Sequence, residues 1–547
     1  MAIFATRAPK YFLRARCCFL VGIFLAGLLT AGCFRREPPA DLTIINGAEP
    51  ESLDPAIIVS QPDMRIVLGM FEGLTRLDPK TGRAVPGLAE RWDVSPDGKI
   101  YTFHLRTNLM WSTGEPITAD DAVYSWIRAL APATASDYAE ALYDVKNARD
   151  FNASGIKDPA QVGIHALDKQ TVRVELDYPA AFFLDICAFP VTAVVPRQTI
   201  EKYGDRWIMA RPLPGSGPYE LVYWRLNDRV RLKKNPHYWD AANTQSDIID
   251  ILPIGSPDTA FNLYESGVAD IVWDKGLVPE ELMDVLLKRP DFHTFSYLGT
   301  YFIRFNVTRK PFDDPRVRQA LALAVDKQSL VKKILRAGEH PASHLVPDGT
   351  ANYTSPEGLD YNPALARKLL ADAGYPNGKG FPRFEYTFDA STGGAAQTHE
   401  DIAVELQQMW RDTLGIQMDL RQVESKIFFS MLSHLDYQVA RSSWIGDYDD
   451  ANTFLGMFVS DDGNNRTGWK NPAYDALILQ ANQQTDLQAR EKIFQKAESM
   501  LVSNGVPIIP LYFYQGLNYF DTNKIQGIYN NVVDQHPLQC IAKIKSP

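Results

Sequence analysis

Hydrophobic and polar residues alternate along some stretches of the chain and recur at helical spacing along others. Residues 101–106 alternate as a half-buried strand should, and the turn-forming sequence at 95–98 just before them predicts a hairpin. The apolar residues 42–45 predict the strand at which the ordered part of the chain begins. These stretches therefore predict β-structure near the start of the folded body.

A helical pattern begins at Asp314, a capping residue that Pro315 follows at the first helical position. Apolar residues then recur at helical spacing until Gly338 ends the pattern, which predicts a packed pair of amphipathic helices. Helical and strand patterns are interleaved along the chain without repeats or low-complexity segments, and this indicates a mixed α/β fold. A chain of 547 residues must divide its core into two or three domains.

The first 32 residues have the features of an export signal. Basic residues precede an uncharged apolar run at 17–31, which is too short to span a bilayer comfortably. The run ends in Ala31-Gly32-Cys33, and small residues before a cysteine resemble a lipobox. We predict a signal peptide at 1–32, lipidation of Cys33, and a tether at 33–40 that holds the body near a membrane. The alternative is an uncleaved membrane anchor, and in both cases the body lies outside the cytoplasm.

Charge and cysteine content narrow the classes of function. Removal of residues 1–32 removes four basic residues and no acidic residue, so the formal net charge falls from −10 to −14. Nucleic-acid binding requires a concentrated basic face, so we expect no nucleic-acid partner. Only Cys187 and Cys540 remain after the signal and lipobox cysteines, and they form either one disulfide or two buried thiols.

Motifs for catalysis and for metal binding are incomplete. The sequence Gly215-Ser216-Gly217 has the wrong spacing for a nucleophile elbow and lacks the third glycine of a dinucleotide loop. His399-Glu400 begins like a zinc-protease helix, but Ala403 stands where the second histidine is required. A calcium loop at 93–104 fails because His104 replaces the bidentate glutamate. We therefore predict no catalytic residue, no metal and no cofactor.

An aromatic and acidic segment follows an alternating one near residue 440. The alternating residues 437–441 precede Trp444-Ile445-Gly446-Asp447-Tyr448-Asp449-Asp450. A strand that ends in this way can pair with an extended ligand through main-chain groups while a carboxylate binds an ammonium group. The alternative is a solvated acidic loop at the end of a strand. Composition does not decide between them.

Several ordered blocks of sequence carry a resemblance that covers the chain from about residue 42 to its C-terminus. They are 87–92, 95–98, 101–106, 118–121, 215–219, 305–320 and 444–454. In these blocks the sequence resembles the oligopeptide-binding proteins of ABC importers, which are family 5 extracellular solute-binding lipoproteins for peptides and nickel. The resemblance implies capture of short peptides, delivery to the permease subunits of an ABC transporter, and a monomeric protein in the periplasm or cell envelope, anchored to the membrane through lipid.

The resemblance also implies a fold. This is a two-lobed periplasmic-binding-protein fold, class II-like, with an extra domain inserted in the first lobe. The first lobe would comprise residues 41–85, 198–295 and 516–547, the extra domain residues 86–197, and the second lobe residues 296–515. The two lobes would close on the ligand about a hinge.

The ligand-binding residues are likewise implied by the resemblance. Asp447 matches the aspartate that binds the α-ammonium group of the peptide, while Arg441 and His399 match groups that can meet its carboxylate. Protein strands and tyrosines near the ligand match Ser443, Trp444, Ile445, Val59, Ser60, Gln61, Tyr138, Tyr297 and Tyr301.

The chain departs from the pattern of the family it resembles at several positions, among them Ala451, where proline is commoner after the acidic segment. Val59 replaces a glutamate, Leu432 replaces a basic residue, and Gly299 with Ile445 replaces a cysteine pair, which leaves the preferred peptide length open. Dipeptides or other small ligands such as a nickel chelate, haem or an opine are the alternatives within the family. A secreted hydrolase is the alternative from another class.

Overall fold

The computed structural model describes residues 37–390 and 395–545. The predicted signal peptide, its predicted cleavage site and Cys33 lie outside the described residues. Residues 41–547 form one unit by themselves, and the site described below lies within it. In the described ranges no helix combines the length and the apolar character needed to cross a membrane.

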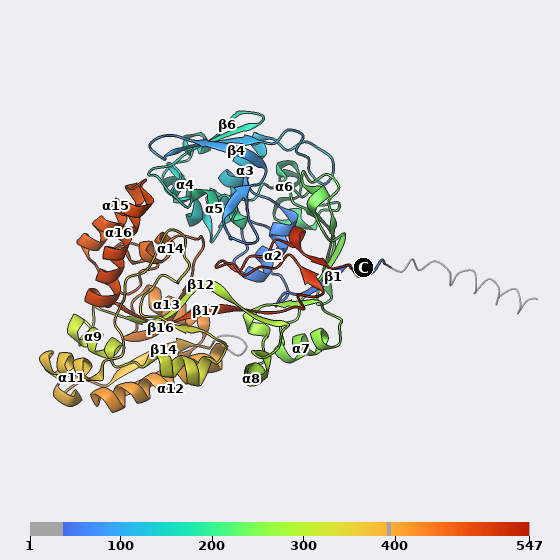
Figure 1. The fold of residues 1–547 in the computed structure, drawn as a ribbon. Helices are drawn as coiled ribbons and strands as arrows, with labels where there is room; N and C mark the ends of the chain where they lie inside the picture. The colour runs from blue at the N-terminus through green and yellow to red at the C-terminus, as the bar shows by residue number, and fades with distance from the viewer. Residues whose placement is uncertain (1–36, 391–394, 546–547) are drawn as a thin grey trace, which may run out of the picture. The chain divides into compact units, whose positions relative to one another are not determined.

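A large mixed sheet runs through this unit (Figure 1). Its strand order is β15-β14-β16-β12-β17-β11-β1-β10-β9-β8, and β13 pairs with β17 beside this path. The strand bounds are β1 Leu42–Ile45, β8 Tyr219–Arg225, β9 Arg229–Lys234, β10 Ile248–Leu252, β11 Ile271–Trp273, β12 Phe292–Phe305, β13 His340–Pro341, β14 Phe384–Asp389, β15 Met418–Val423, β16 Val439–Ile445 and β17 Ile508–Tyr519. The strand predicted at 42–45 is confirmed as β1.

The long strands β12 and β17 join the two halves of this sheet. The start of β12 pairs with the end of β17, next to β11, and the rest of β12 pairs with both β16 and the start of β17. The β12–β17 ladder is interrupted between Ser296 and Thr300. The strands β12 and β17 therefore run from one half of the sheet into the other, and the pairing between these two strands is irregular near residues 296–300.

A second sheet of four antiparallel strands lies apart from the large one, at the top of Figure 1. Its order is β4-β5-β7-β6, with bounds Ala89–Val94, Ile100–Leu105, Thr171–Glu175 and Ile164–Asp168. Helices α3 (Ala119–Leu130), α4 (Ala148–Asn152) and α5 (Phe183–Ile186) accompany it. Their buried side chains, including Phe103, Trp126 and Phe183, form a core distinct from those of the large sheet.

The hairpin predicted from the sequence at 95–106 is confirmed. Tyr101, Phe103 and Leu105 on β5 are buried and alternate with less buried neighbours. The turn before β5 closes where the Gly98 N–H donates to the Ser95 carbonyl at 2.8 Å. Gly98 has φ +69°, a left-handed conformation that glycine adopts without steric cost.

The predicted helix pair is also confirmed. Asp314 caps α9 (Pro315–Leu323) because its side chain accepts a hydrogen bond from the Arg316 N–H at 2.8 Å. Helix α10 (Lys327–Leu330) follows and continues as a π-helical turn over Val331–Leu335. Gly338, at φ +87°, lies shortly after the end of this turn. The apolar face of α9 belongs to the core that the end of β12 shares with β14 and β16.

Most of the remaining helices lie around the large sheet, whereas α6 (Arg197–Tyr203) lies near α3 (Figure 1). The others are α2 Gln61–Met70, α7 Pro257–Glu265, α8 Met283–Leu286, α11 Pro363–Asp372, α12 Ala395–Leu414, α13 Ser425–Ser433, α14 Asn452–Leu455, α15 Pro472–Gln483 and α16 Leu487–Ser499. The short strand pairs are β2 Thr75–Leu77 with β3 Ala84–Pro86, and β18 Ile525–Gln526 with β19 Ala542–Lys543.

The structure distinguishes between the two alternatives for Cys187 and Cys540, a disulfide or two thiols. Both Cys187 and Cys540 carry free thiols, so the structure shows two thiols rather than a disulfide. Burial raises the pKa of the Cys187 thiol well above its usual range.

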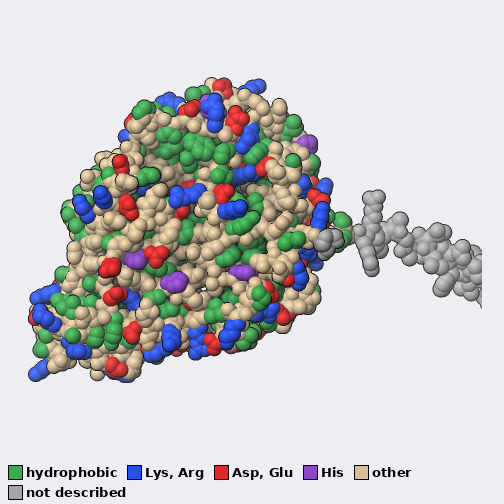
Figure 2. Space-filling view, in the orientation of Figure 1, with side chains coloured by type: hydrophobic (Ala, Val, Ile, Leu, Met, Phe, Trp, Pro, Cys, Tyr) green, Lys and Arg blue, Asp and Glu red, His purple; other side chains and the backbone are tan. Residues whose placement is uncertain are grey.

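On the face shown in Figure 2, acidic and basic side chains are interspersed, and no extended basic patch covers that face.

Candidate ligand-binding site

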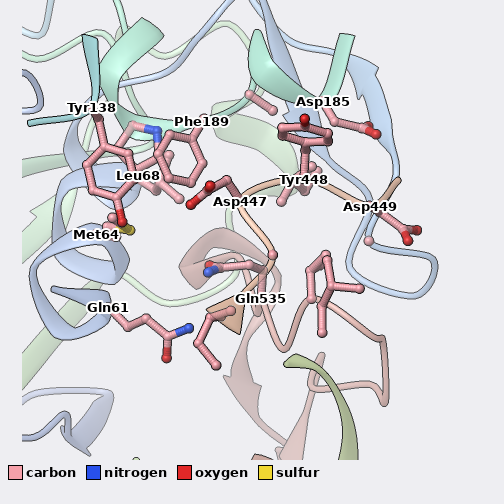
Figure 3. A pocket seen from close by; sticks show the side chains of 18 of the residues that line it. Gln61, Met64, Leu68, Tyr138, Asp185, Phe189, Asp447, Tyr448, Asp449 and Gln535 are labelled. Carbon is pink, nitrogen blue, oxygen red and sulfur yellow. The ribbon is translucent and has the colours of Figure 1, made fainter. Parts of the chain in front are cut away.

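A cavity of about 200 Å³ lies where β16 ends and the loop 446–450 begins. Its walls come from parts of the chain that are distant in sequence (Figure 3). They include the start of α2, the segment from Tyr138 to Pro190, strand β12 and the C-terminal residues Val533 and Gln535. Hydrophobic side chains such as Met64, Leu68 and Phe189 form much of this lining.

Asp447 presents its carboxylate to this cavity, pointing toward Phe189 and Tyr138 (Figure 3). Its N–H donates to Thr453 Oγ1 at 3.2 Å, which holds the backbone in place. Within the described residues, no group donates a hydrogen bond to this carboxylate and no cation pairs with it. Burial, with a smaller contribution from the negative charge of Glu140, raises the pKa of Asp447 to about 7.

The raised pKa has a simple chemical consequence. An ionised carboxylate that is removed from water without a partner is costly, and a cation placed next to it lowers that cost. Tyr138 and Phe189 stand beside it with ring centroids 5.1 Å apart. Aromatic faces attract cations, so the carboxylate and the two rings together suit an ammonium group. The sequence did not single out Phe189, Met64 or Leu68.

The acidic loop after Asp447 is not a solvated one. Asp449 and Asp450 are buried, and each has partners in the protein. The Asp449 carboxylate accepts from the Ala351 N–H at 2.8 Å, and Asp450 accepts two hydrogen bonds from Arg490 at 2.6 and 2.8 Å. The interpretation of this segment as an exposed acidic loop is therefore wrong.

A second cavity, of about 550 Å³, lies toward α7, α8 and α12. His399 and Arg441 line it together with Tyr512 and Tyr514. Arg441 is already paired, since its Nε donates to Asp389 Oδ1 at 2.6 Å. Its lining also contains the carboxylates of Asp258, Asp274, Glu281 and Glu339. The basic groups that the resemblance assigned to a ligand carboxylate thus lie in a mixed, partly neutralised setting.

The structure distributes the twelve predicted ligand-binding residues over three places. The first cavity is lined by Val59, Gln61, Tyr138, Tyr297, Ile445 and Asp447, and the second by His399 and Arg441. Ser60, Ser443, Trp444 and Tyr301 line neither cavity.

Each of these four residues has a contact within the protein. Ser60 caps α2 by accepting from the Asp63 N–H at 3.2 Å, and Ser443 Oγ accepts from Arg441 at 3.2 Å. The Trp444 Nε1–H donates to Thr453 Oγ1 at 3.3 Å. Tyr301 is fully buried and stacks on Tyr512 at 4.9 Å.

One departure noted in the sequence has a clear geometry. Gly299 and Ile445 are direct partners on β12 and β16. A Cβ atom on Gly299 would come within 2.6 Å of Ile445 Cδ1. The isoleucine thus occupies the space that a side chain at 299 would need, and it lines the first cavity.

Comparisons with known proteins agree with this arrangement. The sequence profile described as "Bacterial extracellular solute-binding proteins, family 5 Middle" matches residues 83–466. The chain is 36% identical to the periplasmic oligopeptide-binding protein OppA of Salmonella typhimurium over 479 residues, covering 86% of each protein. It is 34% identical to the probable deoxycholate-binding periplasmic protein YgiS of Escherichia coli, covering 86% of this chain and 87% of that protein.

Solved structures match almost the whole chain. OppA of Haemophilus influenzae in complex with the peptide RPPGFSPFR has a TM-score of 0.76 and 30% identity, with 93% of this chain and 100% of that one covered. The unliganded open form of the murein tripeptide-binding protein MppA has a TM-score of 0.79 and 32% identity, with 93% and 98% covered. The chain is thus similar to binding proteins in sequence and in fold.

Proposed function

The chain belongs to the bacterial extracellular solute-binding proteins of family 5, and we propose that it captures short peptides and delivers them to an ABC importer. The predicted α/β fold is confirmed by the solved structures that it matches. Peptide capture is proposed because relatives are named for oligopeptide binding and one solved neighbour holds a peptide. The protein acts outside the cytoplasm, as its periplasmic relatives do.

The observation that carries the proposal is the carboxylate of Asp447. It faces the first cavity, has no donor among the described residues, and has a pKa raised to about 7, mainly by burial. A peptide α-ammonium group would supply the missing cation through a charge-assisted hydrogen bond. We therefore propose Asp447 as the residue that binds the first amino group of the ligand.

The edge of β16 next to Asp447 offers main-chain groups for an extended ligand. β14 pairs with β16 only at Val439 and Ala440, whereas β12 pairs with β16 as far as Ile445. Residues 441–445 therefore have one edge to which no strand is paired in the described chain. An extended peptide can add to such an edge as a further strand, with its amino end near Asp447. We propose Ser443, Trp444 and Ile445 as main-chain contacts, which explains why the side chains of Ser443 and Trp444 need not line the cavity.

The lobe boundaries predicted from the resemblance remain part of the proposal. Residues 41–85, 198–295 and 516–547 would form the first lobe, 86–197 the extra domain, and 296–515 the second lobe. The boundary at 295–296 lies next to the interruption of the β12–β17 ladder, which begins after Ser296, and this supports a hinge there. The open form of MppA supports movement between such lobes in a protein of similar fold.

Other ligands of the family are less compatible with this cavity. The relative YgiS is named for deoxycholate, which is an anion at neutral pH. An anion near the partnerless carboxylate of Asp447 would be repelled, and it would find no basic residue among those that line the cavity. Dipeptides carry the same ammonium group as longer peptides and stay within the proposal.

Anchoring and partners extend the proposal beyond the described residues. We propose that Cys33 carries the lipid, that the protein works as a monomer, and that its partner is the permease of an ABC transporter. The Cys33→Ala variant should lose incorporation of labelled palmitate when expressed as the full precursor. Labelling that persisted in this variant would show that the lipobox assignment is wrong.

Native mass spectrometry of the protein purified without denaturation would test the function directly. We expect co-purified masses that correspond to short peptides, and we expect calorimetry with those peptides to give saturable binding without hydrolysis products. Intact lipids or bile acids in place of peptides would contradict the proposal. Turnover of the peptides would favour the secreted hydrolase instead.

A further inference from the structure

Four consecutive side chains of the loop 446–450 point to four different partners. Asp447 faces the first cavity, Tyr448 and Asp449 contact segments that precede residue 190, and Asp450 binds α16. The segments that these residues join belong to different hydrophobic cores. A loop that carries the proposed ligand-binding carboxylate therefore also joins two parts of the molecule.

Tyr448 makes the first of these contacts. Its ring stacks on Phe182 with centroids 4.1 Å apart and an interplanar angle of 11°. It packs against the core of the four-stranded sheet, although the residues that follow it, such as Ala451 and Phe454, belong to the core beneath α14–α16. The side chain of Tyr448 therefore connects the core of the four-stranded sheet with the core beneath α14–α16.

Asp449 makes the second contact. Its Oδ2 lies 3.4 Å from Arg83 Nε, while Oδ1 accepts from the Ala351 N–H at 2.8 Å. Arg83 belongs to the segment between β2 and β3, and Asp449 to the loop after β16. The Arg83 side chain is 44% exposed, so this ion pair is open to screening by salt.

The base of the loop is held firmly. Asp450 accepts two hydrogen bonds from Arg490 on α16, and the Gly446 N–H donates to the Leu298 carbonyl at 2.7 Å. A Cβ atom on Gly446 would come within 2.6 Å of Leu298, so only glycine fits there without a shift. Because Gly446 and Asp450 are both fixed, a displacement of Tyr448 or Asp449 should also displace Asp447, which lies in the same short loop.

We propose that Tyr448 and Asp449, with their partners Phe182 and Arg83, are positioning residues that couple recognition of the ligand at Asp447 to closure of the two lobes. The proposal rests on the proposed function and on its lobe assignment. In the closed arrangement, the stack and the ion pair hold Asp447 against the aromatic wall of Tyr138 and Phe189. When they separate, the carboxylate leaves that wall and the ligand is released.

The first test removes the stack by Phe182→Leu, with the same substitution at an exposed phenylalanine, Phe429→Leu, as the control. Phe429 is an exposed phenylalanine on α13 that lines neither cavity. An aromatic pair contributes modestly beyond its burial, so we expect dissociation of a bound peptide to accelerate about 2- to 10-fold in Phe182→Leu. The control should dissociate at the wild-type rate. The Tyr448→Leu and Phe182→Leu changes together should have less effect than the product of the two.

The second test removes the ion pair by Arg83→Gln, with Arg309→Gln as the control. Arg309 also pairs with an aspartate, Asp436, and is 45% exposed, which matches Arg83 closely. Added salt should accelerate peptide dissociation more in the wild type and in Arg309→Gln than in Arg83→Gln. Solution scattering at saturating peptide should give a larger radius of gyration for the double variant Phe182→Leu/Arg83→Gln than for the wild type.

A purely structural role would give a different pattern. It would lower the melting temperature while dissociation rates, salt dependence and scattering stayed at wild-type values, and this pattern would overturn the coupling. If the coupling acts through Asp447, the acceleration of dissociation should be larger for a free peptide than for its N-acetylated form, because only the free peptide uses the carboxylate. Failure of the wild type to bind any peptide would instead contradict the proposed function.

Discussion

Arg441 and Asp389 form a buried ion pair in which Nε lies 2.6 Å and Nη2 2.5 Å from the same carboxylate oxygen. The arginine that lines the second cavity is therefore largely neutralised before any ligand carboxylate arrives. We expect C-terminal amidation of a peptide to weaken its binding by less than about fivefold, in the range of an exposed ion pair. Calorimetry with a free and an amidated peptide measures this difference. A loss above about 100-fold would show that Arg441 or His399 binds the carboxylate strongly.

Stability should depend strongly on the ion pair between Arg490 and Asp450. Both residues are buried, and the guanidinium group donates two hydrogen bonds to the carboxylate. Arg490→Ala would leave a buried carboxylate unpaired, so we expect the free energy of unfolding to fall by about 3–5 kcal/mol. Urea denaturation followed by circular dichroism measures the change. Lys470→Ala, which breaks the exposed pair with Asp461, should change it by less than about 1 kcal/mol.

Local sequence patterns predicted the elements whose cause is local. The hairpin at 95–106 and the helix that begins after Asp314 follow from a turn sequence, an alternating pattern and a capping residue. The π-helical turn at Val331–Leu335 has no such pattern, because its lysines and apolar residues equally suit an ordinary helix. The strand order of the large sheet could not be derived locally, since β1 lies between β10 and β11.

In the candidate site too, some residues could be predicted from the sequence and others depend on how the chain folds. The aromatic and acidic pattern around Asp447 left two interpretations open, and only the resemblance to oligopeptide-binding proteins singled out Asp447 itself. Phe189, Met64 and Leu68 were missed because an apolar residue in a lining wall has the same sequence signal as one in a core. Tyr301 was carried over from relatives by alignment, yet its side chain is fully buried and stacks on Tyr512. Alignment transfers a position along the strand, and the surrounding side chains decide what that position contacts.

Peptide affinity should depend on pH through Asp447. The pKa of its carboxyl group is about 7, and an ammonium ligand requires the ionised form. Below pH 7 we expect affinity to fall by up to about tenfold per pH unit, because binding must then release a proton. Above about pH 8 it should fall again as the peptide amine, with a pKa near 7.7–8.0, loses its charge. Calorimetry from pH 5 to pH 9 measures this profile, and an N-acetylated peptide should show neither limb.

The raised pKa of Asp447 should lower the free energy of unfolding as pH rises toward 7, whereas it should raise peptide affinity over the same range. A carboxyl group whose pKa is raised on folding favours the folded state most below its ordinary pKa of 3.8, and this contribution is lost as pH rises through about 7. Burial also raises the pKa of Glu72 to about 7 and that of Asp185 to about 6. Without added peptide, Asp447→Asn should therefore gain stability relative to the wild type as pH rises from 5 to 8. An unchanged difference in melting temperature across this range would contradict the raised pKa.

The sharpest prediction concerns the contact between Asp447 and the amino group of the peptide. Asp447→Ala would leave a buried ammonium group without an anionic partner, so we expect binding to weaken by about 2–5 kcal/mol, roughly 30- to 4,000-fold. An N-acetylated peptide lacks that charge and should bind the wild type poorly for the same reason. Because its binding no longer uses the carboxylate, the substitution should cost the acetylated peptide little, and a double cycle isolates the pairwise contribution. Calorimetry with both peptides on both proteins completes the cycle. Equal affinity of the wild type for the free and the acetylated peptide would remove Asp447 from the site and would favour a ligand without an amine.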